Sequence, residues 1–460
     1  MKLNKYKIYR NNLCRGYIES ENKYKAVDEM LDYYDDIGMI KQLRVGLPAS
    51  GHLRLPIVNG LNYNVDYILN KITKTGRNRL KISDTIFAGG KGFTLNKCIA
   101  AALGETFERI FGSFIFFERF EGHISGSYKE LSKEYNLLSP KNFSLFTEKE
   151  NIDNKHMCEK FDENSKLIWV EMKNANSDKK MWVPAQLIYL LYVGKQSENQ
   201  IGYSSSGGLS CHNTIYDAKN HGIYEIIERD AINICWNCKI PPKIIDFDKE
   251  VKSQKLKMLF DRYYYLLDDI KVYLHDVTND AYVITAIKKD SNIKKYYYLS
   301  GGGVSTNIDE AIEGAITEFI QAENNLKNLI FTPDWHAAHS INYLFNVPED
   351  VDYRDLKLFY QIVPYYGIDK NFNKLYWYLN NGELIKYSNI KKIAKLNDDF
   401  PEGFWCVDFT NEQLNYIKII KSFNPVLTPA YMSSVPMKGH KRYRKYASGD
   451  KMVEDPIPFP

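Results

Sequence analysis

The chain has 460 residues, of which 44% are hydrophobic and 26% are charged, and its net charge is only +4. This composition is typical of a folded globular protein, and a charge so near neutrality gives no indication of nucleic-acid binding. No apolar run is long enough to cross a membrane, and the N-terminal residues lack the apolar core of a secretion signal. We therefore expect no nucleic-acid partner and no membrane partner.

Seven cysteines are scattered along the chain. An odd number at such spacing argues against a disulfide framework and predicts reduced thiols in a cytoplasmic protein. Cys235 and Cys238 form a Cys-x-x-Cys pair, but no second pair accompanies them, so a zinc site is not indicated. We interpret both residues as thiols of the core.

Residues 1–80 are mixed in character and are interpreted as an N-terminal extension, whereas residues 81–460 are expected to form one large domain. Hydrophobic periodicity and turn signals divide this domain into helices and strands. In chain order we expect a helix at 94–112, a hairpin at 166–193, a Gly/Ser-rich loop at 204–208, a helix at 214–238, strands at 270–288 and 294–300, a glycine turn at 301–303 and a helix at 308–326. The alternation predicts a mixed α/β fold of the α+β class.

The first helix places small side chains and carboxylates on one face, because residues three and four apart lie together on a helix. This face carries Ala101, Gly104, Glu105 and Glu108. The opposite face is apolar and is predicted to face the core. It carries Ile99, Leu103, Phe107 and Ile110.

The second and third helices repeat this pattern. The second is expected to be capped by Thr214, with Asp217 three residues further. Its polar face carries His221, Gly222, Glu225 and Glu228. The third helix is expected to be capped by Asn307. Its polar stripe consists of Glu310, Gly314, Glu318 and Gln321. Gly207 and Gly208, before the second helix, are interpreted as allowing the backbone to approach a ligand, although a plain turn would have the same sequence.

Taken alone, a Glu-x-x-Glu-Arg sequence is usually a solvated face with an internal ion pair. Three acidic helices with small residues beside the carboxylates favour another interpretation. Converging carboxylates repel one another unless a cation neutralises them, and Mg²⁺ prefers oxygen ligands, often completed by substrate phosphates. Because the chain has no Gly-x-x-x-x-Gly-Lys-Ser/Thr loop, the pattern predicts a nucleotide–magnesium site without that loop.

Three prolines alternate in residues 456–460. Each fixes its own φ and holds the preceding residue extended, so this tail is predicted to be a stiff segment of polyproline II character. Without the acidic helices, a solvated tail would be the preferred interpretation. The basic stretch 438–445 before it is interpreted as a solvated face, with guidance of an acidic peptide as the alternative.

In this order, these segments resemble the YcaO family, over about residues 85–330 and again at the tail. The segments that resemble the family's ATP and Mg²⁺ motifs are 90–92 with 102–109, 213–217 with 225–231, and 301–303 with Thr317, Glu318 and Gln321. The alternating prolines resemble the terminus of members that act on peptides. The resemblance implies a single YcaO-type domain that uses ATP and Mg²⁺.

Carried over position by position, the resemblance implies a set of site residues. The implied magnesium ligands are Glu105, Glu108, Glu225 and Glu228. The implied ATP contacts are Lys91, Glu105, Asn213, Asp217, Glu225, Arg229, Glu318 and Gln321. The carboxylate of Pro460, held by the stiff tail, is expected to act as the catalytic base or to position it.

Three positions depart from the family pattern. Ala102 stands where serine is common, Asp217 where glutamate is common, and Gly314 where an arginine is common. We therefore expect one hydroxyl contact to be missing and Asp217 to reach its metal through water. Another basic side chain must serve the phosphates, or that contact is absent.

The resemblance implies an azoline-forming cyclodehydratase, the D-protein of thiazole/oxazole-modified peptide biosynthesis. A Cys, Ser or Thr side chain of a ribosomal precursor peptide attacks the preceding amide carbonyl, whose oxygen is phosphorylated by ATP and leaves as phosphate. The implied partners are a separate E1-like or ThiF-like leader-binding protein, a flavin-dependent azoline dehydrogenase and a second copy in a homodimer. Two alternatives stay open, a thioamide synthetase that uses external sulfide and a non-catalytic nucleotide-binding scaffold subunit.

Overall fold

The computed structural model describes most of the chain. The described residues are 21–32, 40–46, 55–64, 85–118, 122–153, 158–190, 192, 197–249, 251–267, 269–289, 298–331, 347–356, 361–391, 393, 403–447 and 452–459. No helix within these ranges combines the length and the apolar character that a membrane span requires.

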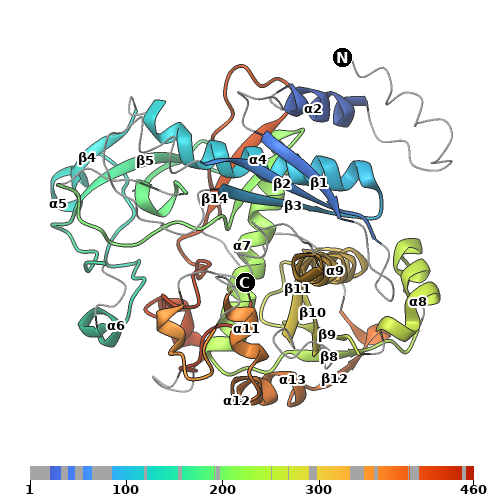
Figure 1. Ribbon diagram of the computed structural model, residues 1–460. Helices are drawn as coiled ribbons and strands as arrows, with labels where there is room; N and C mark the ends of the chain where they lie inside the picture. The colour runs from blue at the N-terminus through green and yellow to red at the C-terminus, as the bar shows by residue number, and fades with distance from the viewer. Residues whose placement is uncertain are drawn as a thin grey trace.

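The described strands form three sheets (Figure 1). The smallest has the order β1 (Ile40–Gly46), β2 (Ile57–Asn64), β3 (Thr85–Lys91). The six-stranded sheet has the order β4 (Ile124–Ser127), β5 (Lys166–Asn174), β13 (Trp405–Asp408), β14 (Lys418–Phe423), β7 (Leu209–His212), with β6 (Lys180–Pro184) paired to β5. The five-stranded sheet has the order β11 (Tyr298–Ser305), β10 (Tyr282–Lys289), β9 (Lys271–Leu274), β8 (Lys243–Asp246), β12 (Leu384–Lys386).

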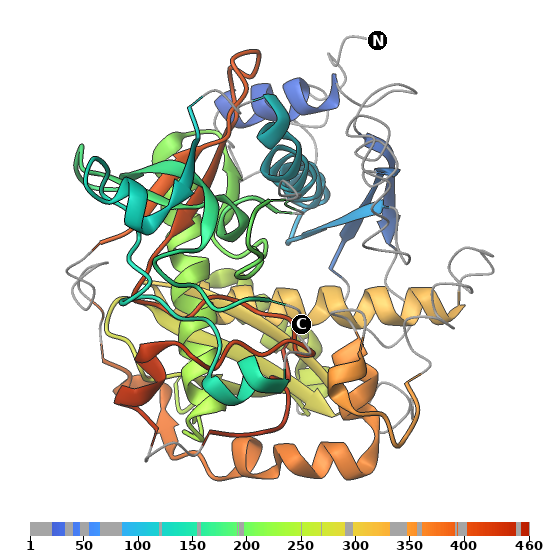
Figure 2. The same cartoon turned by 90° about the vertical axis from the view of Figure 1, so that its left-hand side faces the viewer.

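Three long helices connect these sheets in pairs. α4 (Leu95–Glu118) contacts β2 and β3 on one side and β7 and β14 on the other. α7 (Ile215–Asn237) contacts β7 and β14, and also β10 and β11. α9 (Ile308–Phe331) contacts β10 and β11, and also β1 and β3. Each helix thus packs against two of the three sheets, and together the helices surround the middle of the fold (Figures 1 and 2).

The remaining helices are shorter than these three, and one of them, α11, is buried throughout. They are α2 (Glu21–Leu31), α5 (Tyr128–Leu131), α6 (Glu148–Asp153), α8 (Gln254–Leu267), α11 (Ile362–Gly367), α12 (Asp369–Phe372) and α13 (Tyr376–Asn380) (Figure 1). β2 belongs to the predicted N-terminal extension, and it pairs with β3 of the predicted domain. The boundary between residues 80 and 81 stays a prediction.

Several local predictions are confirmed. The three acidic helices are present as α4, α7 and α9, and β5 and β6 form the expected hairpin. The Thr214 hydroxyl caps α7 by accepting the backbone N–H of Asp217 at 3.0 Å. The apolar face of α4 is in the core, with Leu103 and Phe107 fully buried. Cys235 and Cys238 are buried free thiols.

The predicted glycine turn at 301–303 is wrong, because these glycines lie inside strand β11. Glycine is depleted in strands, and here its presence has a steric cause. A Cβ on Gly301 would lie 2.2 Å from the backbone nitrogen of Phe319, and one on Gly303 would lie 2.1 Å from the carbonyl oxygen of Ala311. The missing side chains allow α9 to pack directly on the strand.

Buried polar groups fasten the C-terminal segment to α7, and the ribbon of this segment runs beside that helix (Figure 2). Asp230, on α7, accepts hydrogen bonds from the backbone N–H and the hydroxyl of Thr428 at 2.8 and 2.9 Å, and from Arg442 at 2.6 Å. Trp236, on the same helix, donates to the carbonyl oxygen of Asp455 at 3.0 Å. The polar side of α7 therefore holds residues that come about 200 positions later in the chain.

The interpretation of 438–445 as a solvated face is wrong for part of that stretch. His440 and Arg442 are buried, at 3% and 7% exposure, because they hold the segment against the core. The proline tail is not solvated either. Residues 456–459 are buried. The Tyr366 hydroxyl donates a hydrogen bond to the Pro456 carbonyl oxygen, and the Ser433 hydroxyl donates one to the Ile457 carbonyl oxygen at 3.1 Å. Pro460 lies outside the described residues.

We expect Arg442→Met to lower the free energy of unfolding by about 3–5 kcal/mol, because it leaves the buried Asp230 carboxylate without its cation. Urea denaturation monitored by tryptophan fluorescence measures the change. The control is Arg354→Met, which removes a partly exposed ion pair with Asp352 and should cost less than about 1 kcal/mol. Equal effects of the two substitutions would contradict a clamping role for the buried pair.

Candidate functional site

Glutamates from α4, α7 and α9 lie close enough to perturb one another's ionisation. Burial raises the pKa of Glu108 well above its ordinary value, and the charges of Glu225 and Glu105 raise it further. Burial also raises the pKa of Glu228 to about 7, with Glu318 and Glu225 adding to the effect while Arg229 opposes it. The structure therefore brings Glu105, Glu108, Glu225, Glu228 and Glu318 into one cluster, which we call the glutamate cluster.

Basic side chains are interleaved with this cluster. Lys91, at the end of β3, forms an ion pair with Glu318, and Arg109 pairs with Glu105 at 2.5 Å. Burial of Glu318 acts to raise its pKa, but the ammonium of Lys91 outweighs this and lowers the pKa. Arg229 lies near Glu228, Glu225 and Glu318, whose charges raise its pKa although burial acts to lower it.

Backbone N–H groups orient two of the glutamates. The N–H of Gly89 donates to Glu105 Oε2 at 2.6 Å, and the N–H of Gly208 donates to Glu225 Oε2 at 3.0 Å. A carboxylate that accepts such a bond is stabilised in its charged form. These two contacts fix the positions of acidic side chains on two different helices.

The glycines beside the cluster make room for the protein's own groups. A Cβ on Gly302 would lie 2.7 Å from Glu228 Oε1, and one on Gly89 would lie 2.2 Å from Gln321 Nε2. Gly208 has a φ of +80° and approaches the Ser422 carbonyl, which a Cβ would meet at 2.5 Å. The close approach expected for the Gly207 and Gly208 loop is thus an approach to strand β14.

Asn213 and Asp217 lie at the N-terminal end of α7. Asp217 accepts a hydrogen bond from the Thr214 hydroxyl at 2.7 Å, so the cap occupies one of its oxygens. Glu225 follows two helical turns later, about 12 Å along the axis at 1.5 Å per residue. Asp217 therefore lies about two helical turns from Glu225 along α7, and the contacts of Asn213 and Asp217 with ATP stay a prediction.

Gly314 explains why an arginine is absent from that position of α9. A Cβ there would lie 3.2 Å from the Cα of Gly303, because the helix lies directly on β11. The nearby basic groups instead come from Lys91, Arg109 and Arg229, and from one lysine that the sequence analysis missed.

That lysine is Lys421, on strand β14. It is only 4% exposed, and its Nζ donates to the carbonyl oxygens of Ser205 and Gly207, both at 2.7 Å. Burial lowers its pKa to about 8, while Glu225 and Glu108 act to raise it. The available signal was a lysine that directly follows two isoleucines in the predominantly apolar stretch 419–423.

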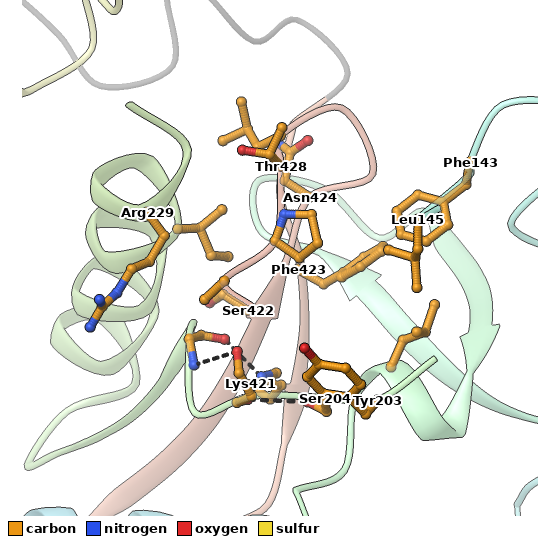
Figure 3. A pocket seen from close by; sticks show the side chains of 17 residues that line it. Phe143, Leu145, Tyr203, Ser204, Arg229, Lys421, Ser422, Phe423, Asn424 and Thr428 are labelled. Carbon is orange, nitrogen blue, oxygen red and sulfur yellow. Dashed lines mark hydrogen bonds between the residues drawn. The ribbon is translucent and has the colours of Figure 1, made fainter. Parts of the chain in front are cut away.

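A cavity lies beside Lys421, between the loop at 203–207, strand β14 and residues 427–430 (Figure 3). Lys421 and Arg229 contribute to its lining, and the apolar part includes Phe143, Leu145 and Phe423. The Lys421 hydrogen bonds to the loop are drawn at its lower edge in Figure 3. The cavity therefore adjoins the glutamate cluster through two cationic residues.

The donor set fits Mg²⁺ that is bound together with a nucleotide. Among the described residues, no three His, Cys, Asp or Glu side chains are grouped closely enough to hold a metal ion without other ligands. Converging carboxylates repel one another unless a cation neutralises them, and Mg²⁺ commonly takes some of its oxygen ligands from phosphates.

We expect Glu228→Gln to stabilise the ligand-free protein above about pH 7. Folding raises the pKa of Glu228 from 4.5 to about 7, so the stability it contributes is fully present below pH 4.5 and is lost as the pH rises through 7. Glutamine cannot ionise and avoids this loss. The measurement is thermal unfolding at about pH 5.5 and about pH 8, with and without ATP and Mg²⁺.

The same substitution should remove the stabilisation that ATP and Mg²⁺ give to the unaltered protein. Glu171→Gln is the control, since Glu171 pairs with Lys180 away from the cluster and should change neither result. If the unaltered and Glu228→Gln proteins lost the same stability between the two pH values, Glu228 would not titrate as described.

Comparison with solved structures shows the same fold in proteins of low sequence identity. A heterocyclase in complex with substrate and cofactor superposes with a TM-score of 0.70 at 15% identity, covering 95% of this chain and 57% of that one. The YcaO protein of Methanopyrus kandleri bound with AMPPCP and Mg²⁺ gives 0.58 at 14% identity, covering 94% and 95%. The E. coli microcin synthetase McbBCD complex gives 0.59 at 14% identity, covering 93% and 99%.

Sequence comparison adds one relative and one family. An uncharacterized protein of Methanothermobacter thermautotrophicus is 27% identical over 161 residues, which is 34% of this chain and 41% of that protein. This chain thus matches less than half the length of that relative. The sequence model described as YcaO cyclodehydratase, ATP- and Mg²⁺-binding, matches residues 89–368 and so contains α4, α7 and α9. The chain therefore belongs to the YcaO family, whose cofactors are ATP and Mg²⁺.

Proposed function

We propose that this chain is an ATP-dependent peptide cyclodehydratase. It activates backbone amides of a ribosomal precursor peptide by phosphorylation and converts Cys, Ser or Thr residues to azolines. The main support is the glutamate cluster, which three helices of a YcaO-family chain build around one region. The heterocyclase with substrate and the microcin synthetase support the same class of activity through their common fold.

The proposed roles follow from charge and position. Glu105, Glu108, Glu225 and Glu228 hold Mg²⁺, which suits their hard oxygen donors. The nucleotide contacts are assigned to Lys91, Glu105, Asn213, Asp217, Glu225, Arg229, Glu318 and Gln321. When bound, ATP supplies the phosphoryl group that is transferred to the amide oxygen, and Mg²⁺ disperses the negative charge on that phosphoryl group.

The protein's own contribution is to place the reacting groups and to accept a proton. Lys91 and Arg229 are the cations closest to Glu318 and Glu228, and they can orient an anionic ligand there. For the base we propose the Pro460 carboxylate, because the residues before it are buried and fixed. The Phe459 ring packs against Tyr378 and His275, with centroids 6.1 and 6.4 Å away.

The partners are proposed on the same basis. A separate E1-like or ThiF-like protein binds the leader of the precursor peptide, a flavin-dependent dehydrogenase oxidises the azolines, and the chain forms a homodimer. The structural neighbours include a microcin synthetase complex that has pro-MccB17 bound, which supports a peptide substrate.

Mass spectrometry of a precursor peptide incubated with the protein, its partner, ATP and Mg²⁺ tests the reaction. We expect a loss of one water for each modified residue, and no loss with Glu108→Ala. A gain equal to the exchange of oxygen for sulfur when sulfide is supplied would instead indicate thioamide formation. An unchanged peptide mass with ATP still bound would contradict the enzyme and favour a scaffold subunit.

A short extension after Pro460 tests the proposed base. If the carboxylate accepts the proton, displacing it should lower kcat by about 100- to 10,000-fold, the usual contribution of general-base catalysis, while ATP binding stays normal. Steady-state turnover and ATP affinity are measured on the same preparation. Full turnover by the extended protein at normal ATP affinity would eliminate the carboxylate as base.

A further inference from the structure

Lys421 lies at the glutamate cluster although it belongs to none of the segments that carry the family motifs. It is on β14, beyond the residues 89–368 that match the family model. Its side chain is buried, and a buried ammonium ion is costly unless other groups compensate its charge. The groups that compensate it show what the lysine does.

Two of the three ammonium protons are donated to one loop. The acceptors are the carbonyl oxygens of Ser205 and Gly207, each 2.7 Å from Nζ. The next residue of β14 fastens the same loop, because the Ser422 N–H donates to the Gly208 carbonyl at 2.7 Å. Consecutive residues of one strand therefore determine where this loop lies.

The loop transmits its position to a glutamate. The Gly208 N–H, immediately after the carbonyl groups bound by Lys421, donates to Glu225 Oε2 at 3.0 Å. Gly208 reaches this place only with its φ of +80° and without a Cβ. If the loop moved, this N–H would no longer direct the Glu225 carboxylate.

The lysine also supplies a charge to the cluster. Glu108 on α4 and Glu225 on α7 are the acidic groups that interact electrostatically with it. A positive charge between two helices reduces the repulsion between their carboxylates. Lys421 thus acts on the same glutamates through the loop and through its charge.

We propose that Lys421 is a positioning residue of the Mg²⁺–nucleotide site, which holds the 205–208 loop so that Gly208 orients Glu225 and which offsets the repulsion between Glu108 and Glu225. The proposal rests on the proposed function only in taking these glutamates as ligands of the bound Mg²⁺. Residues that support metal ligands in this way typically change metal affinity about 10- to 100-fold when they are replaced.

The test is the Mg²⁺ dependence of binding of a fluorescent ATP analogue to full-length Lys421→Met. We expect the Mg²⁺ concentration at half-saturation to rise by about 10- to 100-fold, with binding restored at high Mg²⁺. Lys438→Met is the control, since Lys438 is a half-buried lysine that also donates to a backbone carbonyl, that of Val453 at 2.6 Å. For Lys438→Met, the Mg²⁺ concentration at half-saturation should equal that of the unaltered protein. A folded Lys421→Met protein with unchanged half-saturation overturns the proposal.

A double-mutant cycle with Glu225→Gln adds a second readout. If Lys421 acts through Glu225, the two substitutions together should raise the Mg²⁺ concentration at half-saturation by less than the product of their separate fold-changes, and independent effects would contradict this route.

If Lys421→Met does not fold, Lys421→Arg decides, because it retains the charge. Recovery of both fold and Mg²⁺ affinity supports the proposal, whereas recovery of the fold alone, or of neither, overturns it. Because these are binding measurements, they stand even if peptide cyclodehydration is not found.

Discussion

The repulsion among the clustered glutamates is the constraint on which the rest of the structure depends. Burial and the charge of Glu225 on α7 raise the pKa of Glu108 on α4, and such groups would separate if the scaffold allowed it. The sheets prevent this, since α4, α7 and α9 are each packed between two of them. Lys91, Arg109 and two backbone N–H groups then compensate part of the charge. The packed helices therefore hold these carboxylates beside one another and beside the cations that partly neutralise them.

Close contact between backbones makes this arrangement precise. A helix lies on β11 without intervening side chains at Gly301 and Gly303, and the same is true of α4 on β3, where a Cβ on Gly90 would lie 1.7 Å from the Cys98 carbonyl. Such contacts leave little freedom to slide, because any displacement meets rigid backbone rather than a flexible side chain. The glutamates are therefore held by the packing of main chain on main chain.

The sequence predicted the parts of the fold that depend on local signals. The amphipathic pattern of α4 and the Thr214 cap of α7 involve neighbours within a few residues, and both are confirmed. The glycines 301–303 were predicted to form a turn because glycine is a poor strand residue. The side chain that a Cβ on Gly302 would meet is that of Glu228, which lies on α7, far from Gly302 in the sequence. Lys421 was missed for a similar reason, since the loop it binds precedes it by more than 200 residues. The neighbouring sequence therefore does not identify the partner of either residue.

The pairing of Asp230 with Arg442 has a consequence for how the chain is made. The two residues are separated by 212 positions, so a ribosome completes α7 long before the arginine exists. Until then the aspartate, which is 1% exposed in the finished protein, must remain hydrated, and the helix cannot be sealed into its final place. Folding during synthesis proceeds from the N-terminus, and contacts so distant in sequence slow it. The middle of the chain, which contains α7, is thus translated well before Arg442 and Asp455, and the contacts that fasten α7 to the C-terminal segment form only after that segment has been made.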